Sequence, residues 1–219
     1  MPILKKIFRE LKPFLVFIVL LVVFRTVVAD WGPVPTGSME PNIYPGDVVW
    51  IDKTAYGPSL PFSDKRILAW GSPDRGDVVT FTHARKRYVK RVIGVPGDTI
   101  RIVGNDITIN GHHLPRSIVE TTDQLTIGVE NIFGKKHAFK IDDQKIIPHF
   151  GRTITVPADK LFVIGDFRNN SVDSRHYGFI GQDRVTGKVS GVALSFSVER
   201  GITPLGSAGP ALMVAIPVR

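Results

Sequence analysis

Two residues of this sequence could together attack a carbonyl group: Ser38 as the nucleophile and Lys90 as its base. Ser38 lies in the segment 35–41 (PTGSMEP), where prolines bracket a turn and Gly37 permits a tight bend that exposes the serine hydroxyl. A serine hydroxyl needs a neighbouring group to take its proton. Because Gly-Ser turns are common and mostly have no catalytic role, the assignment depends on the base.

The strand-like segment 88–95 (YVKRVIGV) supplies a candidate base. Strand alternation places Lys90 on one face with Tyr88 and Val92, whereas Arg91 lies on the other face. Apolar neighbours remove water from an ammonium group and lower its pKa. A lysine pKa brought from ~10.4 to ~7–8 would let Lys90 accept the serine proton at neutral pH, which a guanidinium cannot do. The alternative is that Lys90 lies on the charged face of an edge strand.

The six histidines offer no better base. Two of them, His112 and His113, follow an Asn-Gly turn and are typical of a solvated hairpin. Three stand in polar segments, namely His83, His137 and His149. The sixth is His176, and no carboxylate is expected to hold it. No pair has the spacing of a zinc site, and a metal is not expected. The absence of cysteine excludes thiol nucleophiles, disulfides and thiolate metal sites.

A third polar segment, 165–175 (GDFRNNSVDSR), follows directly after an apolar strand candidate. Such a run can be a solvated turn. It also contains what a buried network beside a catalytic lysine would need, namely hydroxyls to orient the amine and an Asp–Arg pair to fix the loop.

These segments together resemble the bacterial type I signal peptidases, the S26 family of Ser–Lys peptidases. The resemblance covers most of residues 30–198 and is specific because four motifs occur in order. They are PTGSMEPNIYPGD at 35–47, RGDVVTF at 75–81, YVKRVIGVPGD at 88–98 and GDFRNNSVDSR at 165–175.

The resemblance implies a serine endopeptidase with Ser38 as nucleophile and Lys90 as general base. The backbone N–H of Ser38 and the hydroxyl of Thr36 would form the oxyanion hole, although members more often have serine or glycine at the second position. Ser171 would hydrogen-bond the lysine amine, while Asp173 and Arg175 would pair to hold their loop. The residues Phe167 and Asn169 depart from the usual GDNRDNS motif, which puts fine packing and substrate preference in question.

The resemblance also implies the substrate. Val34, Tyr88 and Val89 would line shallow apolar pockets that select small residues, of the Ala-X-Ala type, before the cut. The substrates would be exported preproteins with signal peptides, and no cofactor is implied. Position 90 is lysine, as in the bacterial and organellar members that the sequence resembles, whereas the endoplasmic-reticulum relatives have histidine there.

The elements that must position these residues are mainly β-strands. Period-two alternation between Gly and Pro residues predicts strands at 47–52, 77–82, 88–95, 99–103, 107–109, 153–156, 161–165 and 189–196. We expect a mainly β fold, with an antiparallel catalytic domain at 30–200 and a tail at 201–219. Residues 112–152 are polar and only weakly strand-like, so we interpret them as an inserted subdomain or loop region.

The N-terminal residues 1–29 predict a basic cytoplasmic end and a transmembrane anchor. Phe14 to Phe24 are uninterruptedly apolar, and Arg25 near the far end could reach the headgroups. The alternative is a cleaved signal peptide ending at Ala29, against which Arg25 argues. Either interpretation places the body on the extracytoplasmic side, and the resemblance implies a single pass through the bacterial inner membrane.

The formal charge of +8 suits an anionic membrane surface or nucleic acid. The N-terminal basic residues flank the apolar run. The second basic cluster, at 85–91, lies in a valine-rich strand candidate and is not part of a recognisable nucleic-acid-binding module. We therefore expect membrane lipids and no nucleic acid as partners.

Three alternatives compete with general signal-peptide removal. A specialised pilin-maturation peptidase of conjugative transfer would share the same clan. A self-cleaving repressor would share the chemistry, but the apolar run at 14–24 argues strongly against it. A catalytically inactive membrane-tethered β-domain would retain the residues without using them.

Overall fold

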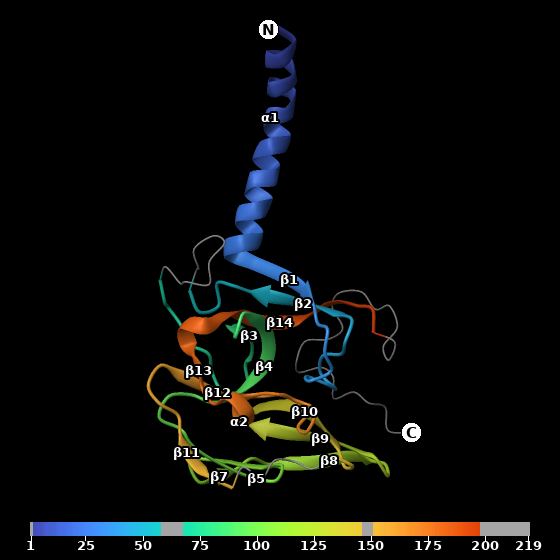
Figure 1. Ribbon diagram of the computed structural model, residues 1–219, viewed down its shortest axis with the longest axis vertical. Helices are drawn as coiled ribbons and strands as arrows, with labels where there is room; N and C mark the ends of the chain where they lie inside the picture. Colours follow the sequence, from blue (N-terminus) through green and yellow to red (C-terminus); the bar gives the residue numbers. More distant parts are fainter. Residues whose placement is uncertain (1, 58–67, 146–150, 198–219) are drawn as a thin grey trace.

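The computed structural model describes residues 2–57, 68–145 and 151–197. The tail at 201–219 predicted from the sequence and His149 lie outside the described residues. Figure 1 shows a long helix that leaves one end of a body built of β-strands. The mainly β fold predicted from the sequence is confirmed.

Helix α1 (Pro2–Val23) continues as a π-helical turn, η1 (Phe24–Val28), and leads directly into β1 (Ala29–Pro33). The stretch Arg9–Val28, which includes most of α1 and all of η1, is long and apolar enough to cross a membrane, and none of it is buried against the described protein. At 1.5 Å per residue, twenty residues span roughly 30 Å, the thickness of a bilayer's hydrocarbon core. At its base Asp30 accepts from Arg25 and from Arg87, each at 3.1 Å, which ties the helix end to the β body.

The main sheet has seven antiparallel strands in the order β1-β2-β14-β3-β4-β12-β13. The remaining strands of this sheet are β2 (Asp47–Asp52), β3 (Val78–His83), β4 (Lys86–Gly94), β12 (Lys160–Ile164), β13 (Ile180–Gly181) and β14 (Val185–Ser195). Strand β4 pairs with β3 on one side and β12 on the other. The residues of β4 that pair with β12 are Arg91, Val92 and Gly94, whereas Lys90 pairs only with Val79 of β3. Lys90 is nevertheless 3% exposed, so it does not lie on an exposed charged face of the strand.

Two smaller sheets lie at the end of the body away from α1 (Figure 1). One has the order β11-β5-β6-β7, formed by β5 (Thr99–Val103), β6 (Asp106–Ile109), β7 (His112–His113) and β11 (Thr153–Thr155). The other has the order β10-β9-β8, formed by β8 (Arg116–Thr121), β9 (Leu125–Ile132) and β10 (Lys135–Asp142). The loop-region interpretation of 112–152 is thus wrong for the described part, which forms regular antiparallel strands.

Short helical turns complete the body after β12. They are α2 (Ser174–Tyr177) and the 3-10 turn η2 (Gln182–Arg184). Asp173 caps the N-terminus of α2, and its Oδ1 lies 4.0 Å from His176 Nδ1. The capping geometry directs the Asp173 backbone N–H, at 3.5 Å, rather than its carboxylate, towards the His176 ring.

The apolar core explains why the strands predicted from alternation form. Val92 packs with Phe81 and Val163 on one face of the main sheet, and Tyr88 packs against the same cluster. Val89 packs instead against the cluster that contains Val34 and Met39. The predicted alternation is confirmed for Tyr88 and Val92 on one face and Val89 on the other. Lys90, between them in the sequence, is buried.

Candidate active site

Ser38 lies in the turn between β1 and β2. Met39, which is fully buried, anchors this turn in the core. The turn is closed by hydrogen bonds from the N–H groups of Glu40 and Ile43 to the carbonyl oxygens of Gly37 and Met39, each at 3.0 Å. The anchored turn holds Ser38 at the surface of the core, where its side chain is largely buried.

Lys90 reaches this serine from the middle of β4. Its Nζ lies 2.6 Å from Ser38 Oγ and 3.0 Å from the carbonyl oxygen of Val89. The lysine is 3% exposed. Burial lowers the pKa of Lys90 to about 8, and the Arg175 charge adds to this, although Asp173 and Asp166 act in the opposite direction. An amine with this pKa and this contact can accept a hydroxyl proton near neutral pH.

The segment 165–175 folds back beside the pair through an ion pair. Arg175 Nε and Nη2 donate to the two carboxylate oxygens of Asp173, each at 2.8 Å, as predicted. Burial alone would raise the pKa of Asp173, but the bonds and charge of Arg175 and the N–H of Gly165 outweigh it and lower that pKa. Both side chains are buried, so the pair fixes the loop.

Ser171 does not hydrogen-bond the Lys90 amine, and this expectation is wrong. Its Oγ is buried without a hydrogen-bond partner among the described residues, although it lies close enough to Asp173 to help lower the pKa of that carboxyl. The hydroxyl still lies at the site, because a Cβ on Gly165 would come within 2.2 Å of Ser171 Oγ and 2.5 Å of the Ser38 carbonyl oxygen. The close approach of the serine turn and the 165–175 segment leaves room for glycine only at position 165.

A cleft of about 700 Å³ runs past the pair. The predicted pocket residues Val34, Tyr88 and Val89 all line it, as does Thr36. The rest of its lining is formed by Pro35, Gly37, Ser38, Met39, Lys86, Arg87, Lys90, Asn170 and Val172. The cleft therefore brings together the candidate nucleophile, base, oxyanion donor and apolar pocket residues. Within the described ranges no group of three or more His, Asp or Glu side chains could hold a metal ion.

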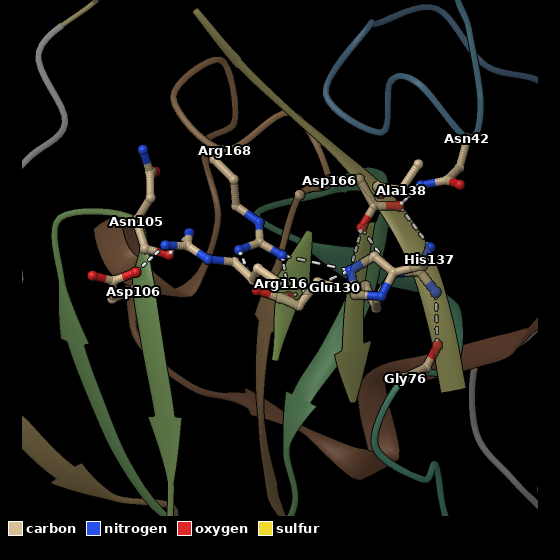
Figure 2. Close-up of polar contacts among 12 residues, drawn as sticks. Asn42, Gly76, Asn105, Asp106, Arg116, Glu130, His137, Ala138, Asp166 and Arg168 are labelled. Atoms are coloured by element: carbon tan, nitrogen blue, oxygen red, sulfur yellow. Dashed lines mark hydrogen bonds and ion pairs between the residues drawn. The ribbon is translucent and has the colours of Figure 1, made fainter. Parts of the chain in front are cut away.

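Sequence reasoning missed a buried ion pair directly under the site. Arg91 Nε and Nη2 donate to the two oxygens of Asp166 at 2.8 and 2.6 Å. Asn42, four residues after Ser38, donates to Asp166 Oδ2 and to the carbonyl oxygen of Ala138, each at 2.7 Å (Figure 2). The signal that could have found this pair is an arginine on the strand face that also carries Val89 and Ile93, since such a position is buried only with a partner.

Sequence comparisons identify the relatives of this chain. A family model described as signal peptidase, peptidase S26, matches residues 7–194. A protein named Signal peptidase I from Pseudomonas aeruginosa is 30% identical over 203 residues, which cover 84% of this chain and 72% of that protein. One of the same name from Rickettsia typhi is 30% identical over 223 residues, covering 89% and 83%. A crystal structure of a signal peptidase I from Enterococcus faecalis aligns with 54% of this chain and 97% of its own, at 27% identity and a TM-score of 0.36.

Proposed function

The chain belongs to the signal peptidase family, peptidase S26, and is a serine endopeptidase that removes signal peptides; we propose that Ser38 and Lys90 are its catalytic pair. The observation that carries this proposal is the 2.6 Å contact between Lys90 Nζ and Ser38 Oγ, made by an amine buried in the sheet. The lowered pKa of Lys90 supports the role of a general base.

In the proposed reaction, neutral Lys90 accepts the hydroxyl proton of Ser38 as Oγ bonds to the carbonyl carbon of the substrate. The negative charge on the carbonyl oxygen is stabilised by the Ser38 N–H and the Thr36 hydroxyl. The tetrahedral intermediate then breaks the carbon–nitrogen bond, and the lysine returns its proton to the departing amine. An acyl-enzyme on Ser38 remains.

Hydrolysis of the acyl-enzyme uses the same lysine a second time. Lys90 removes a proton from water as the water oxygen bonds to the acyl carbon, and the proton passes to Ser38 Oγ when the ester bond breaks. The signal peptide leaves with a free carboxylate, and the enzyme returns to its starting state. The Asp173–Arg175 pair keeps the 165–175 loop beside the amine throughout.

The cleft is proposed to bind the segment before the cut in an extended form. Val34 and Val89 give it apolar walls near Ser38, and Tyr88 lies beside them. Shallow apolar pockets favour small side chains, so we propose cleavage after Ala-X-Ala-type sequences. Exported preproteins are the proposed substrates.

The helix Arg9–Val28 is proposed as a single-pass anchor in a bacterial inner membrane. The basic residues before it would stay in the cytoplasm, which puts the β body on the extracytoplasmic side. Because the helix runs straight into β1, the cleft would be held close to the membrane in which a signal peptide resides, with lipids around the anchor.

The test is cleavage of a purified preprotein by the full chain in detergent. Lys90→Ala should abolish cleavage without unfolding the protein, while Lys136→Ala, which removes an exposed lysine on β10, serves as the matched control and should cleave normally. Full activity in folded Lys90→Ala would refute the pair.

The substrate preference needs a separate experiment. A preprotein series should vary the first and third residues before the cut from alanine to leucine and to phenylalanine. We expect cleavage to fall steeply with side-chain size at both positions. Equal cleavage across the series would contradict the pocket assignment, and cleavage of a pilin precursor alone would favour the specialised peptidase.

A further inference from the structure

A third buried ion pair, between Glu130 of β9 and Arg168, has no part in the mechanism above. Arg168 Nη1 and Nη2 donate to Glu130 Oε1 and Oε2 at 3.1 and 2.5 Å. Glu130 is 0% exposed and Arg168 is 2% exposed. The pair joins the small sheet β10-β9-β8 to the loop that carries Asp173 (Figure 2).

The charges around this pair balance. His137 Nε2 lies 3.5 Å from Arg168 Nη2 and from Glu130 Oε2, and 3.8 Å from Asp166 Oδ1. Burial, with the charges of Arg91 and Arg168, holds the pKa of His137 well below its usual range, so the ring is neutral. Two arginines thus face two carboxylates around a neutral imidazole. A buried ion pair adds little net stability compared with apolar side chains of the same size, so its presence calls for another role.

Arg168 is connected to both halves of the catalytic pair. Its backbone carbonyl accepts from Arg175 Nη2, and Arg175 holds Asp173, whose charge acts on the Lys90 amine. The preceding residue, Phe167, donates its N–H to the Ser38 carbonyl oxygen at 3.2 Å. A shift of Arg168 would therefore move groups on both sides of the 2.6 Å contact.

The strand β10 holds the same loop and the serine turn at further points. The backbone of Lys140 accepts from Arg168 N at 2.8 Å and donates to the Asp166 carbonyl oxygen at 2.9 Å. The Lys140 side chain pairs with Glu40, two residues after Ser38, at 2.7 Å. The small sheet is thus attached to both chain segments that must meet at the site.

We infer that Glu130 is a positioning residue of the active site, which acts through Arg168 to fix the 165–175 loop and the Ser38 turn relative to Lys90. This inference rests on the proposed function. It gives the sheet β10-β9-β8 a role in catalysis although none of its side chains lines the cleft.

The test compares three variants of the full chain in detergent. Glu130→Gln keeps the shape of the side chain and removes its charge. Because it leaves Arg168 buried without a carboxylate and can unfold the protein, Glu130→Met with Arg168→Met is made as well, since apolar replacement of the whole pair preserves the fold more often. Glu120→Gln, an exposed glutamate on the neighbouring strand β8, is the matched control.

We expect the double variant to unfold at the wild-type temperature or above and to lose about 10- to 100-fold in kcat, the cost of a small misplacement, with KM nearly unchanged. The pH at which its cleavage rate is half-maximal should shift, because the charges of Asp173, Asp166 and Arg175 act on the pKa of the Lys90 amine. The rate at which a small acylating probe labels Ser38 should fall by the same factor, and Glu120→Gln should match the wild type in every measurement.

A folded double variant with wild-type kcat, labelling rate and pH of half-maximal cleavage would overturn the inference. So would a double variant that does not fold, because the pair would then be required for stability itself. These outcomes differ from a failure of the proposed function, in which the wild type itself would neither cleave a preprotein nor be labelled at Ser38.

Discussion

Replacing Lys90 with methionine should stabilise the folded protein while it abolishes cleavage. The lysine is 3% exposed, and its ammonium form loses hydration in the sheet. Burial lowers its pKa from 10.5 to about 8. At neutral pH the folded state must therefore hold a charge that the unfolded chain keeps in water, and methionine of similar length removes that cost.

The magnitude follows from the pKa difference. One pKa unit corresponds to about 1.4 kcal/mol, so the lowered pKa of Lys90 costs about 3 kcal/mol of folding free energy when both states are protonated. Loss of the hydrogen bond to Ser38 offsets about 1 kcal/mol of the gain. We expect Lys90→Met to be more stable than the wild type by about 2 kcal/mol at pH 7.

The stability difference between the wild type and Lys90→Met should change with pH, and the two pKa values of Lys90 set the direction. The folded-state pKa lies below the unfolded value, so between about pH 8 and pH 10.5 the unfolded chain binds more protons than the folded one. The stability of the wild type relative to Lys90→Met should therefore rise through this window. The gap between the two proteins should be largest below pH 8 and should close near pH 10.5.

The assay is denaturant unfolding of the full chain in detergent micelles, followed by tryptophan fluorescence at several pH values. Lys136→Met, at an exposed position of β10, is the matched control and should change stability by less than about 0.5 kcal/mol. A Lys90→Met protein no more stable than the wild type at neutral pH would refute the reasoning, as would a gap that does not shrink towards pH 10.5.

Three further predictions concern the same loop and lysine. Precursor cleavage should rise about tenfold per pH unit below about pH 8 and level off above it, because only neutral Lys90 accepts the serine proton; a flat profile would contradict this. Asp173→Asn should lower the free energy of unfolding by about 3 kcal/mol because it leaves Arg175 buried without a carboxylate. Because the pKa of Asp173 is lowered, its ionised carboxylate stabilises the folded state at neutral pH, and this stabilisation is lost as the pH falls below 3.8. Identical acid unfolding curves for the wild type and Asp173→Asn would contradict this prediction. Asn169→Asp should cost about 1 kcal/mol, measured by thermal unfolding, because the amide exchanges hydrogen bonds with the backbone of Asp142 and a carboxylate cannot donate; an unchanged unfolding temperature would argue against that contact.

Alternation predicted the strands whose two faces differ in polarity. The bounds predicted for β2 and β5 are those observed, since both alternate between buried and more exposed residues. Strand β14 begins at Val185, four residues earlier than predicted, because Thr186 and Gly187 lie at a register shift that interrupts the pattern. Strand β8 was missed because almost all of it is exposed, which leaves no alternation to detect.

The candidate site was predictable only where several motifs occurred together. Ser38 and Lys90 are 52 residues apart, and no local pattern predicts that their side chains meet. Glu130 and His137 were missed for a different reason. Their types are polar, yet each lies at a buried position of its strand, so a pattern that equates polar residues with solvent assigns them to the wrong environment. Buried polar networks are where this rule fails, because partners far along the chain satisfy the charges.

The lowered pKa of Lys90 follows from its burial. An amine in contact with water would keep a pKa near 10.5, whereas Lys90 is 3% exposed and its ammonium form loses hydration. The same burial would leave an ammonium without partners, so the site needs the polar loop 165–175 beside it. That loop is itself held by buried ion pairs, and the carboxylate that pairs with Arg168 is Glu130 of β9. The requirement for a lysine with a lowered pKa therefore extends, through successive buried pairs, to a sheet none of whose side chains lines the cleft.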